Sequence, residues 1–220
     1  MNKAITNLKN RHTSHWSRDT LRSLVLSLGI FAVAALVQVI ADNYVGKTKG
    51  TAVTDLLLDH LPTADVDTFI ILGSLLLTFI GLFLFLYKPK YVNFGIKALS
   101  IFIIVRAFLI SLTHLGVMPG QLVFDTTSPG FGLYNILYNT SNDFFFSGHT
   151  GIPFLLGLVF WPERHWRYFF LLASLVFGLC VLVARIHYSI DVFAAPFITF
   201  SIFRLTEFLF PKDYEISRSS

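Results

Sequence analysis

The sequence has a single cysteine, Cys180, and few charged residues. One cysteine excludes an intrachain disulfide and any metal site built from several thiolates. Lys, Arg, Asp and Glu together make up only 14% of the 220 residues, whereas a soluble domain usually carries about 25%. The chain has too few charges to cover a water-facing surface, which excludes an ordinary soluble domain.

Apolar residues take the place of the missing charges. They make up 54% of the chain, and the mean hydropathy is +0.66. A disordered chain is excluded because Phe alone supplies 24 residues. The net charge is +4, but the basic residues flank apolar segments and form no stripe, so we expect no nucleic-acid partner. Long apolar runs indicate an integral membrane protein.

Six apolar segments are each close to the ~20 residues that a helix needs to cross the hydrocarbon core. They cover residues 21–41, 67–87, 95–115, 145–162, 168–186 and 188–209. The segments are too long and too uniformly apolar for the strands of a membrane barrel. We therefore predict an all-α membrane protein, a six-transmembrane helix bundle at 21–210. An N-terminal segment, 1–20, and a tail, 211–220, flank this domain.

The distribution of Lys and Arg predicts the orientation of the bundle. Most of the 17 basic residues, among them Lys97, lie before the first segment, after the second and fourth, or at the end of the sixth. The 42–66 connection has only Lys47 and Lys49, and the 116–144 connection has none. We therefore expect both termini in the cytoplasm, and these two connections on the exoplasmic or periplasmic face.

Two arginines lie outside this pattern. Arg106 falls within the third segment, and Arg185 falls at the outer end of the fifth. An arginine at membrane depth is costly and usually faces the bundle interior or a water-filled cavity. Each is either a structural residue, paired with a carboxylate or with backbone carbonyls, or a ligand for an anionic substrate.

Polar residues also gather at the outer ends of the last three segments. The fourth segment opens with Asp143-Phe-Phe-Phe-Ser-Gly-His149. The link between the fifth and sixth contains His187 and Asp191, which would share one face of a helix because they are four residues apart. Asp191 could then accept the proton of one imidazole nitrogen and leave the other nitrogen free to attack.

Two such histidines can divide the work of a displacement at phosphorus. His187 would be the nucleophile and form a phosphohistidine, while His149 would protonate the departing oxygen. Arg106 and Arg185 are candidates to hold the phosphoryl oxygens. The alternatives are that His149 is an interfacial residue and that Asp143 is a helix cap. The sequence has no HExxH or similar motif, so we expect neither a metal nor a cofactor.

These residues resemble the motifs of the sphingomyelin synthase and sphingomyelin synthase-related family, which has the C-terminal-type domain of the PAP2-like superfamily. Residues 146–150, Phe-Ser-Gly-His-Thr, are similar to the third motif of that family. Residues 187–192, His-Tyr-Ser-Ile-Asp-Val, are similar to the fourth motif, usually written HYTIDV. Residues 106–115 resemble the second motif more loosely. The resemblance covers roughly residues 20–210 of the chain.

The resemblance implies a lipid phosphotransferase of PAP2-like fold with its active site on the exoplasmic or periplasmic face. By analogy with the family, His187 attacks the donor phospholipid, Asp191 orients it, and His149 acts as acid and then as base. Asp143 occupies a position that belongs to the family's catalytic group. Neighbouring residues are expected to contact the substrate: Ser147, Gly148 and Tyr188.

The implied partners are membrane lipids. The donor would be a glycerophospholipid carrying phosphocholine or phosphoethanolamine, and the acceptor would be ceramide or diacylglycerol, in a bacterial inner membrane or in the Golgi, ER or plasma membrane. A PAP2-type lipid phosphatase or a phospholipase C-like hydrolase is the first alternative, although a phosphomonoester needs more basic contacts than the outer face offers. The second alternative is a transporter or scaffold, but we find no internal repeat.

Overall fold

The computed structural model describes residues 15–48, 50–138 and 144–219. The longer helices in this part of the chain are α2 (Arg18–Lys47), α3 (Asp67–Tyr87), α4 (Val92–Leu112), α6 (Gly148–Val159), α7 (Arg164–Val183) and α8 (Ser189–Leu209). The shorter ones are α5 (Phe131–Tyr138), α9 (Pro211–Arg218) and the 3-10 turn η1 (Pro89–Tyr91). No strand is present in these ranges beyond an isolated bridge between Thr51 and Leu115.

Among the residues that the structure describes, five helices are long and apolar enough to cross a membrane, which indicates an integral membrane protein. They are α2, α3, α4 with its preceding 3-10 turn, α7 and α8. The bounds of α3 are those predicted for the second segment. Helix α2 is longer than the predicted 21–41, because Ser17 caps its start and it continues to Lys47.

The fourth predicted segment, 145–162, is shorter in the structure. Helix α6 has 12 residues, which span about 18 Å, less than the ~30 Å of a hydrocarbon core. Its start is delayed because Phe145 and Phe146 have φ values of 140° and 39°, outside the helical region. Its continuation is opposed by Pro162, which disfavours helical backbone at the preceding residue. A sixth span therefore stays a prediction.

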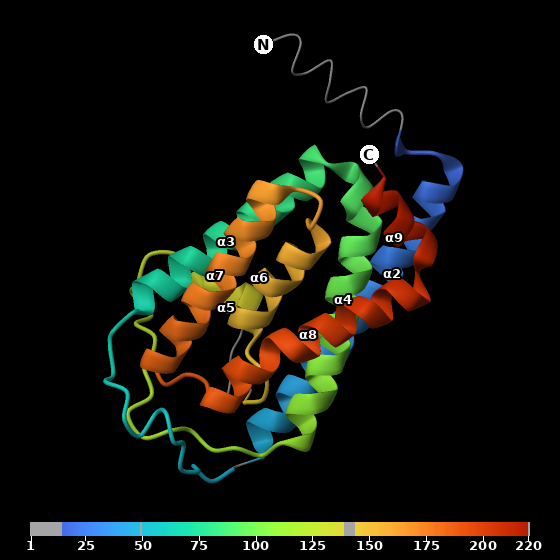
Figure 1. Ribbon diagram of the computed structural model, residues 1–220. Coiled ribbons are helices and arrows are strands. Elements are labelled where there is room, and N and C mark those ends of the chain that lie inside the picture. The colour runs from blue at the N-terminus through green and yellow to red at the C-terminus, as the bar shows by residue number, and fades with distance from the viewer. Residues whose placement is uncertain (1–14, 49, 139–143, 220) are drawn as a thin grey trace.

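The helices form a bundle around an aromatic core (Figure 1). Helix α2 packs along α4, while α6 packs against α7 and α8, and α8 crosses over α4. The main core cluster draws rings from α4, α6, α7 and α8, including Phe94, Phe102, Phe170 and Phe203. Gly151 allows one close approach, because a Cβ there would lie 2.8 Å from the Phe102 ring. Small residues at such contacts let membrane helices pack closely.

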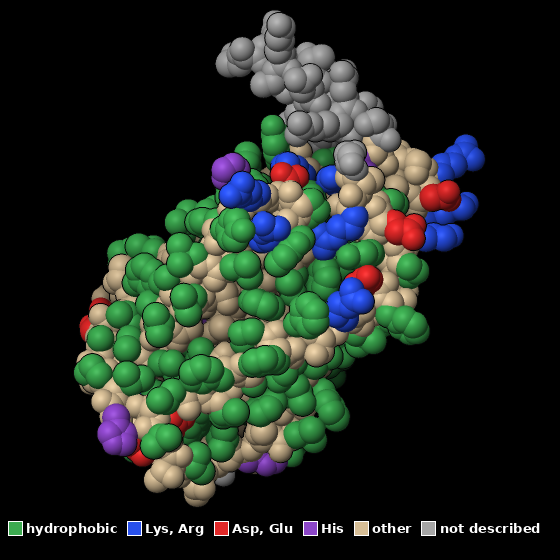
Figure 2. Space-filling model, in the orientation of Figure 1, with side chains coloured by type: hydrophobic (Ala, Val, Ile, Leu, Met, Phe, Trp, Pro, Cys, Tyr) green, Lys and Arg blue, Asp and Glu red, His purple; other side chains and the backbone are tan. Residues whose placement is uncertain are grey.

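The two ends of the bundle differ in charge. Lys and Arg side chains gather at the end that holds the C-terminus, and hydrophobic side chains cover most of the rest of the visible face (Figure 2). Helices α6 and α8 begin at the opposite end, where α4 and α7 finish (Figure 1). The two predicted catalytic motifs therefore lie at the end away from the basic side chains. The assignment of the basic end to the cytoplasm stays a prediction.

Lys97 was predicted to lie in a cytoplasmic connection, and this prediction is wrong. It lies in α4 with only 1% of its surface exposed, and it forms an ion pair with Asp213 of α9. Ser23 of α2 completes the cluster, because its Oγ accepts a bond from Lys97 Nζ and donates one to Asp213 Oδ1, both 2.7 Å long. This cluster holds the predicted tail, as helix α9, against α2 and α4.

We predict that Lys97→Met lowers the free energy of unfolding by about 3–5 kcal/mol, because it leaves the Asp213 carboxylate buried without its cation. The double variant Lys97→Met, Asp213→Leu removes both charges and should be more stable than Lys97→Met alone. Unfolding of the purified protein in detergent measures both effects. An equal loss of stability in the single and the double variant would contradict this account of the ion pair.

Candidate active site

A cavity of about 400 Å³ lies at the end of the bundle where α6 and α8 begin. Both predicted catalytic histidines, His149 and His187, line it. Most of the remaining lining is apolar and includes Val117, Met118, Leu122, Phe124, Phe144 and Ile186. The volume lies within the usual range of small-molecule sites. The structure thus brings together two histidines that are 38 positions apart in the chain.

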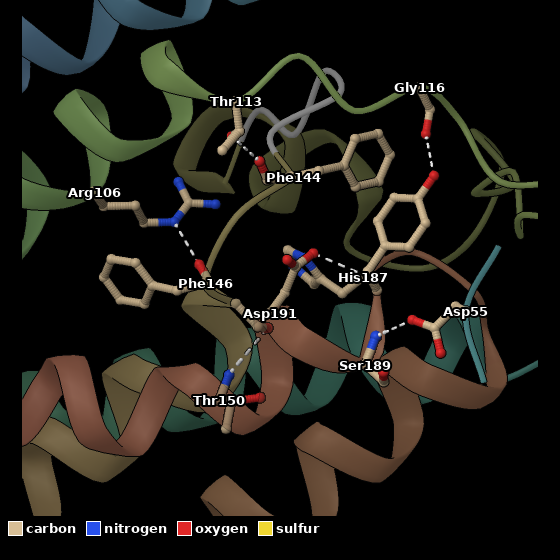
Figure 3. Close-up of polar contacts among 12 residues, drawn as sticks. Asp55, Arg106, Thr113, Gly116, Phe144, Phe146, Thr150, His187, Ser189 and Asp191 are labelled. Atoms are coloured by element: carbon tan, nitrogen blue, oxygen red, sulfur yellow. Dashed lines mark hydrogen bonds and ion pairs between the residues drawn. The ribbon is translucent and has the colours of Figure 1, made fainter. Parts of the chain in front are cut away.

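The predicted pairing of His187 with Asp191 is present, but the expected shared helix face is wrong. Helix α8 begins at Ser189, so His187 lies in the connection before it. Asp191 is in the first turn, and its Oδ2 accepts a bond from the Tyr188 backbone N–H (3.0 Å) and lies 3.3 Å from His187 Nδ1 (Figure 3). The carboxylate caps the helix and orients the imidazole with the same oxygen. His187 and Asp191 are 2% and 0% exposed.

The backbone turn at the end of α7 determines where His187 lies. Ile186 N–H donates to Val181 O (3.1 Å) and Arg185 N–H donates to Leu182 O (2.9 Å). These two bonds form a Schellman motif, which requires a left-handed residue after the helix. Arg185 fills that position with φ of 54°, where glycine is the usual residue. His187 follows two residues later, directly before the α8 cap.

The side chain of Arg185 is directed at backbone carbonyls. One guanidinium nitrogen donates to Pro119 O (3.0 Å), and the other donates to Leu58 O (3.0 Å) and Leu61 O (3.4 Å). Arg185 therefore ties the connection before α3 to the 116–130 loop. Arg185 therefore matches the structural alternative, in which the arginine pairs with backbone carbonyls. Its predicted contact with substrate stays a prediction.

His149 lies in the first turn of α6. Ser147 caps this helix, since its Oγ accepts from the Thr150 N–H at 3.4 Å, and its own N–H donates to Asp191 O at 3.0 Å. The first turns of α6 and α8 are thereby joined through main-chain atoms. The centroids of the His149 and His187 rings lie 6.2 Å apart, with an interplanar angle of 64°. Both rings can therefore reach one phosphoryl group in the shared cavity.

Tyr134 is a site residue that the sequence analysis missed. Its hydroxyl lies 2.9 Å from His149 Nε2, and the residue is 2% exposed. It belongs to α5, a helix inside the predicted 116–144 connection. The signal for this helix was present, because Tyr134 and Tyr138 are four residues apart in an apolar stretch and stack at 5.0 Å. Tyr134 fixes the orientation of the His149 ring.

Arg106 lies against the turn that precedes α6. Its Nε donates to Phe146 O at 3.4 Å, and a Cβ on Gly148 would lie 3.5 Å from the same nitrogen (Figure 3). The left-handed backbone of Phe146 belongs to this turn. Arg106 thus stands beside the N-terminus of α6, where backbone N–H groups and the helix dipole favour an anion.

The other residues that were predicted to contact substrate lie in different surroundings. Ser147 is fully buried as the α6 cap, and Gly148 packs beside Arg106. The Tyr188 hydroxyl donates to Gly116 O at 2.9 Å and accepts from the Val53 N–H at 3.3 Å, so this residue ties two loops together. Asp143 lies outside the described residues.

Asp55, in the loop before α3, stabilises the start of α8. Its Oδ2 accepts from the Ser189 N–H at 2.7 Å, and its Oδ1 accepts from the Leu57 and Leu58 N–H groups (Figure 3). Burial alone would raise the pKa of this carboxyl, but the hydrogen bonds from Ser189, Leu58 and Leu57 outweigh it and lower the pKa below its usual value. Asp55 is thus an anion that stabilises the connection carrying His187.

One stretch of the chain matches a known family. Residues 140–208 match the family model described as PAP2 superfamily C-terminal. The matched stretch covers less than half of the chain. It contains α6, α7 and nearly all of α8, and with them both histidines and Asp191. No curated protein and no solved structure matches the chain. Members of the PAP2 superfamily are usually phosphatases or phosphotransferases, which indicates that this protein is an enzyme.

We predict that Tyr134→Phe lowers kcat/KM for phosphate-ester cleavage about tenfold, because His149 loses the hydroxyl that orients its ring. The pH profile of kcat/KM should shift as well. Tyr138→Phe is the matched control, since its hydroxyl bonds Thr78 Oγ1 at 2.6 Å and not His149. Equal losses in the two variants would show that the hydroxyl of Tyr134 has no special part.

Asp55→Asn should lower the free energy of unfolding by about 1 kcal/mol at neutral pH. The folded-state pKa of Asp55 is lowered, so its contribution is complete above the unfolded pKa of about 4 and is lost as the pH falls through the folded value. The difference between wild type and variant should therefore shrink in acid. Asp59→Asn, an exposed carboxylate on the same loop, is the control. A difference that stays constant between pH 7 and pH 3 would contradict the assignment.

Proposed function

We propose that the protein is a membrane phospholipid head-group phosphotransferase. It moves phosphocholine or phosphoethanolamine from a glycerophospholipid to ceramide or a similar lipid alcohol. One observation carries the proposal: His187, with Asp191 on its Nδ1, and His149 line one apolar cavity with ring centroids 6.2 Å apart. The PAP2 superfamily match supports phosphoryl chemistry at these residues.

In the first step the unbound nitrogen of His187, Nε2, attacks the phosphorus of the donor lipid. Asp191 accepts a hydrogen bond from Nδ1–H and stabilises the positive charge that develops on the ring. The bond from phosphorus to the glycerol oxygen breaks, and that oxygen keeps the electron pair. His149 gives it a proton, so diacylglycerol leaves neutral and the head group remains as a phosphohistidine.

In the second step the hydroxyl of the acceptor lipid attacks the phosphohistidine. His149, now neutral, takes the hydroxyl proton, and the electron pair of the P–N bond returns to His187. Arg106 bonds the Phe146 carbonyl beside the first turn of α6, and we propose that it and the first N–H groups of that helix stabilise the phosphoryl charge. Tyr134 keeps the His149 ring in place through both proton transfers.

The charge of the site favours a phosphodiester over a phosphomonoester. No Lys or Arg lines the cavity in the described part of the chain, and the guanidinium of Arg185 bonds loop carbonyls. Arg106 remains as the nearby cation. A singly charged diester needs fewer basic contacts than a doubly charged monoester. Water in place of the acceptor would make the same residues a phospholipase C-like hydrolase.

The apolar lining and the membrane helices also favour a lipid substrate. The cavity lies at one end of helices that are long enough to cross a bilayer, so a head group can enter it while the acyl chains stay in the hydrocarbon. By the distribution of basic residues, this end faces the exoplasm or periplasm.

We predict that a donor phospholipid labelled at its phosphate transfers the label to the protein. The labelled bond should be stable in alkali and labile in acid, as expected for phosphohistidine. His187→Ala should abolish both label and transfer, and Asp191→Asn should lower the transfer rate at least about a hundredfold. His165→Ala is the matched control, because His165 is exposed near the start of α7, at the other end of the bundle. Transfer by His187→Ala at the wild-type rate would overturn the proposal.

A further inference from the structure

Helix α5 lies beside α3, which is one of the helices long and apolar enough to cross a membrane. The Tyr138 hydroxyl, at the end of α5, bonds Thr78 Oγ1 at 2.6 Å and donates to Ser74 O at 3.1 Å. Thr78 is the twelfth of the 21 residues of α3, so it lies about 16 Å along that helix. This depth is roughly half of a hydrocarbon core. In Figure 1, α5 accordingly lies among the helices of the bundle and not with the loops at its end.

The segment before α5 descends along α3 to this depth. The Asp67 carboxylate, at the start of α3, accepts from the Asp125 N–H at 2.6 Å and from Ser128 Oγ at 3.3 Å. Gly130 lies deeper, because a Cβ there would be 2.9 Å from Leu75 Cδ1. Its φ of 82° and this close approach both favour glycine. The chain therefore enters the bundle from the cavity end of α3, and α5 follows directly.

The composition of this segment suits hydrocarbon. No charged residue lies between Asp125 and Asp143 in the sequence. Three large apolar side chains of α5 are exposed, Leu133 by 42%, Ile136 by 78% and Leu137 by 51%. Asn135 is the exposed polar side chain beside them. Contact of the three apolar side chains with water would cost free energy, whereas contact with acyl chains would not.

The opposite face of α5 meets the candidate active site. The Tyr134 hydroxyl lies 2.9 Å from His149 Nε2, and the Tyr138 ring stacks on the His149 ring with centroids 5.7 Å apart. One side of α5 thus contacts a histidine of the cavity, and the other side is the outer surface of the bundle. The helix forms a wall between His149 and the surroundings of the protein at this depth.

The surface of α3 at the same depth shows what these surroundings are. Its exposed side chains there are also large and apolar: Leu72, Leu76 and Phe79. Acyl chains cover such a surface on a helix that crosses a bilayer. A re-entrant segment is tolerated at membrane depth where protein satisfies its polar groups. The helical backbone of α5 and the bonds of the Tyr138 hydroxyl to α3 meet this condition.

We propose that α5 is a re-entrant helix in the leaflet at the cavity end of the bundle, and that acyl chains of this leaflet cover Leu133, Ile136 and Leu137. The inference does not depend on the proposed reaction, since it requires only that α3 crosses the bilayer. The predicted 116–144 connection then lies partly within the membrane. Membrane lipid packs against the helix whose other face orients His149.

The test measures the depth of a spin label in phosphatidylcholine vesicles. Cys180→Ser removes the single cysteine, so Ile136→Cys then carries one label. Phe79→Cys, on the exposed face of α3, is the hydrocarbon reference, and Asp59→Cys, exposed in the loop before α3, is the water reference. Oxygen partitions into hydrocarbon and a nickel chelate stays in water. The oxygen-to-nickel collision ratio at Ile136 should equal that at Phe79 and exceed that at Asp59 several-fold.

Two results would overturn the inference. A ratio at Ile136 equal to that at Asp59 would place α5 in water. Dipolar broadening of the Ile136 label that disappears on dilution with unlabelled protein would show that a second copy of the chain covers the helix. Leu133→Cys repeats the measurement on the same face, and an unchanged melting temperature of each labelled protein shows that the label leaves the fold intact.

Discussion

The site depends on the Asp191 carboxylate and on the main chain of the same residue. One carboxylate oxygen caps α8 through the Tyr188 N–H and meets His187 Nδ1, while the Asp191 carbonyl accepts from the Ser147 N–H at the start of α6. Helix capping, orientation of the His187 ring and the joining of the two motifs therefore share one residue. Both contacts are made by Oδ2, while Oδ1 is buried and has no hydrogen-bond partner among the described residues.

A second constraint comes from the loops that cover the cavity. Arg185, Tyr188 and Asp55 bond the 50–61 and 116–119 segments with side-chain groups. Gly116 permits the close crossing of these loops, because a Cβ there would lie 2.6 Å from Ala52 N and Gly50 O. The chain accepts left-handed backbone at Phe146 and Arg185, close to both histidines. Charged and aromatic residues next to the predicted catalytic motifs thus hold the loops around the cavity in place.

The family match includes only some of the residues in and around the cavity. The match to the PAP2 superfamily C-terminal model covers residues 140–208, which contain the two histidines and Asp191. Arg106, Gln121 and Tyr134 come from α4, the 116–130 loop and α5, which precede the match. The residues of the proposed chemistry therefore lie in the matched stretch, whereas Arg106, Gln121 and Tyr134 lie in the preceding part of the chain. Low charge in these surroundings suits both a membrane environment and a phosphodiester.

The sequence by itself determined the membrane character and most helix positions, because apolar runs are local properties. The catalytic roles of His149, His187 and Asp191 stay predictions. The sequence predicted α3 to the residue, yet it overestimated α6, since a cap and a turn are decided by a few backbone angles. The tertiary structure alone decided three contacts. Tyr134 bonds His149, Lys97 belongs to a buried ion pair, and Arg185 bonds two loops together. Each depends on contacts between distant segments, and a charge in a sequence does not show whether a carboxylate, a carbonyl or a substrate will face it.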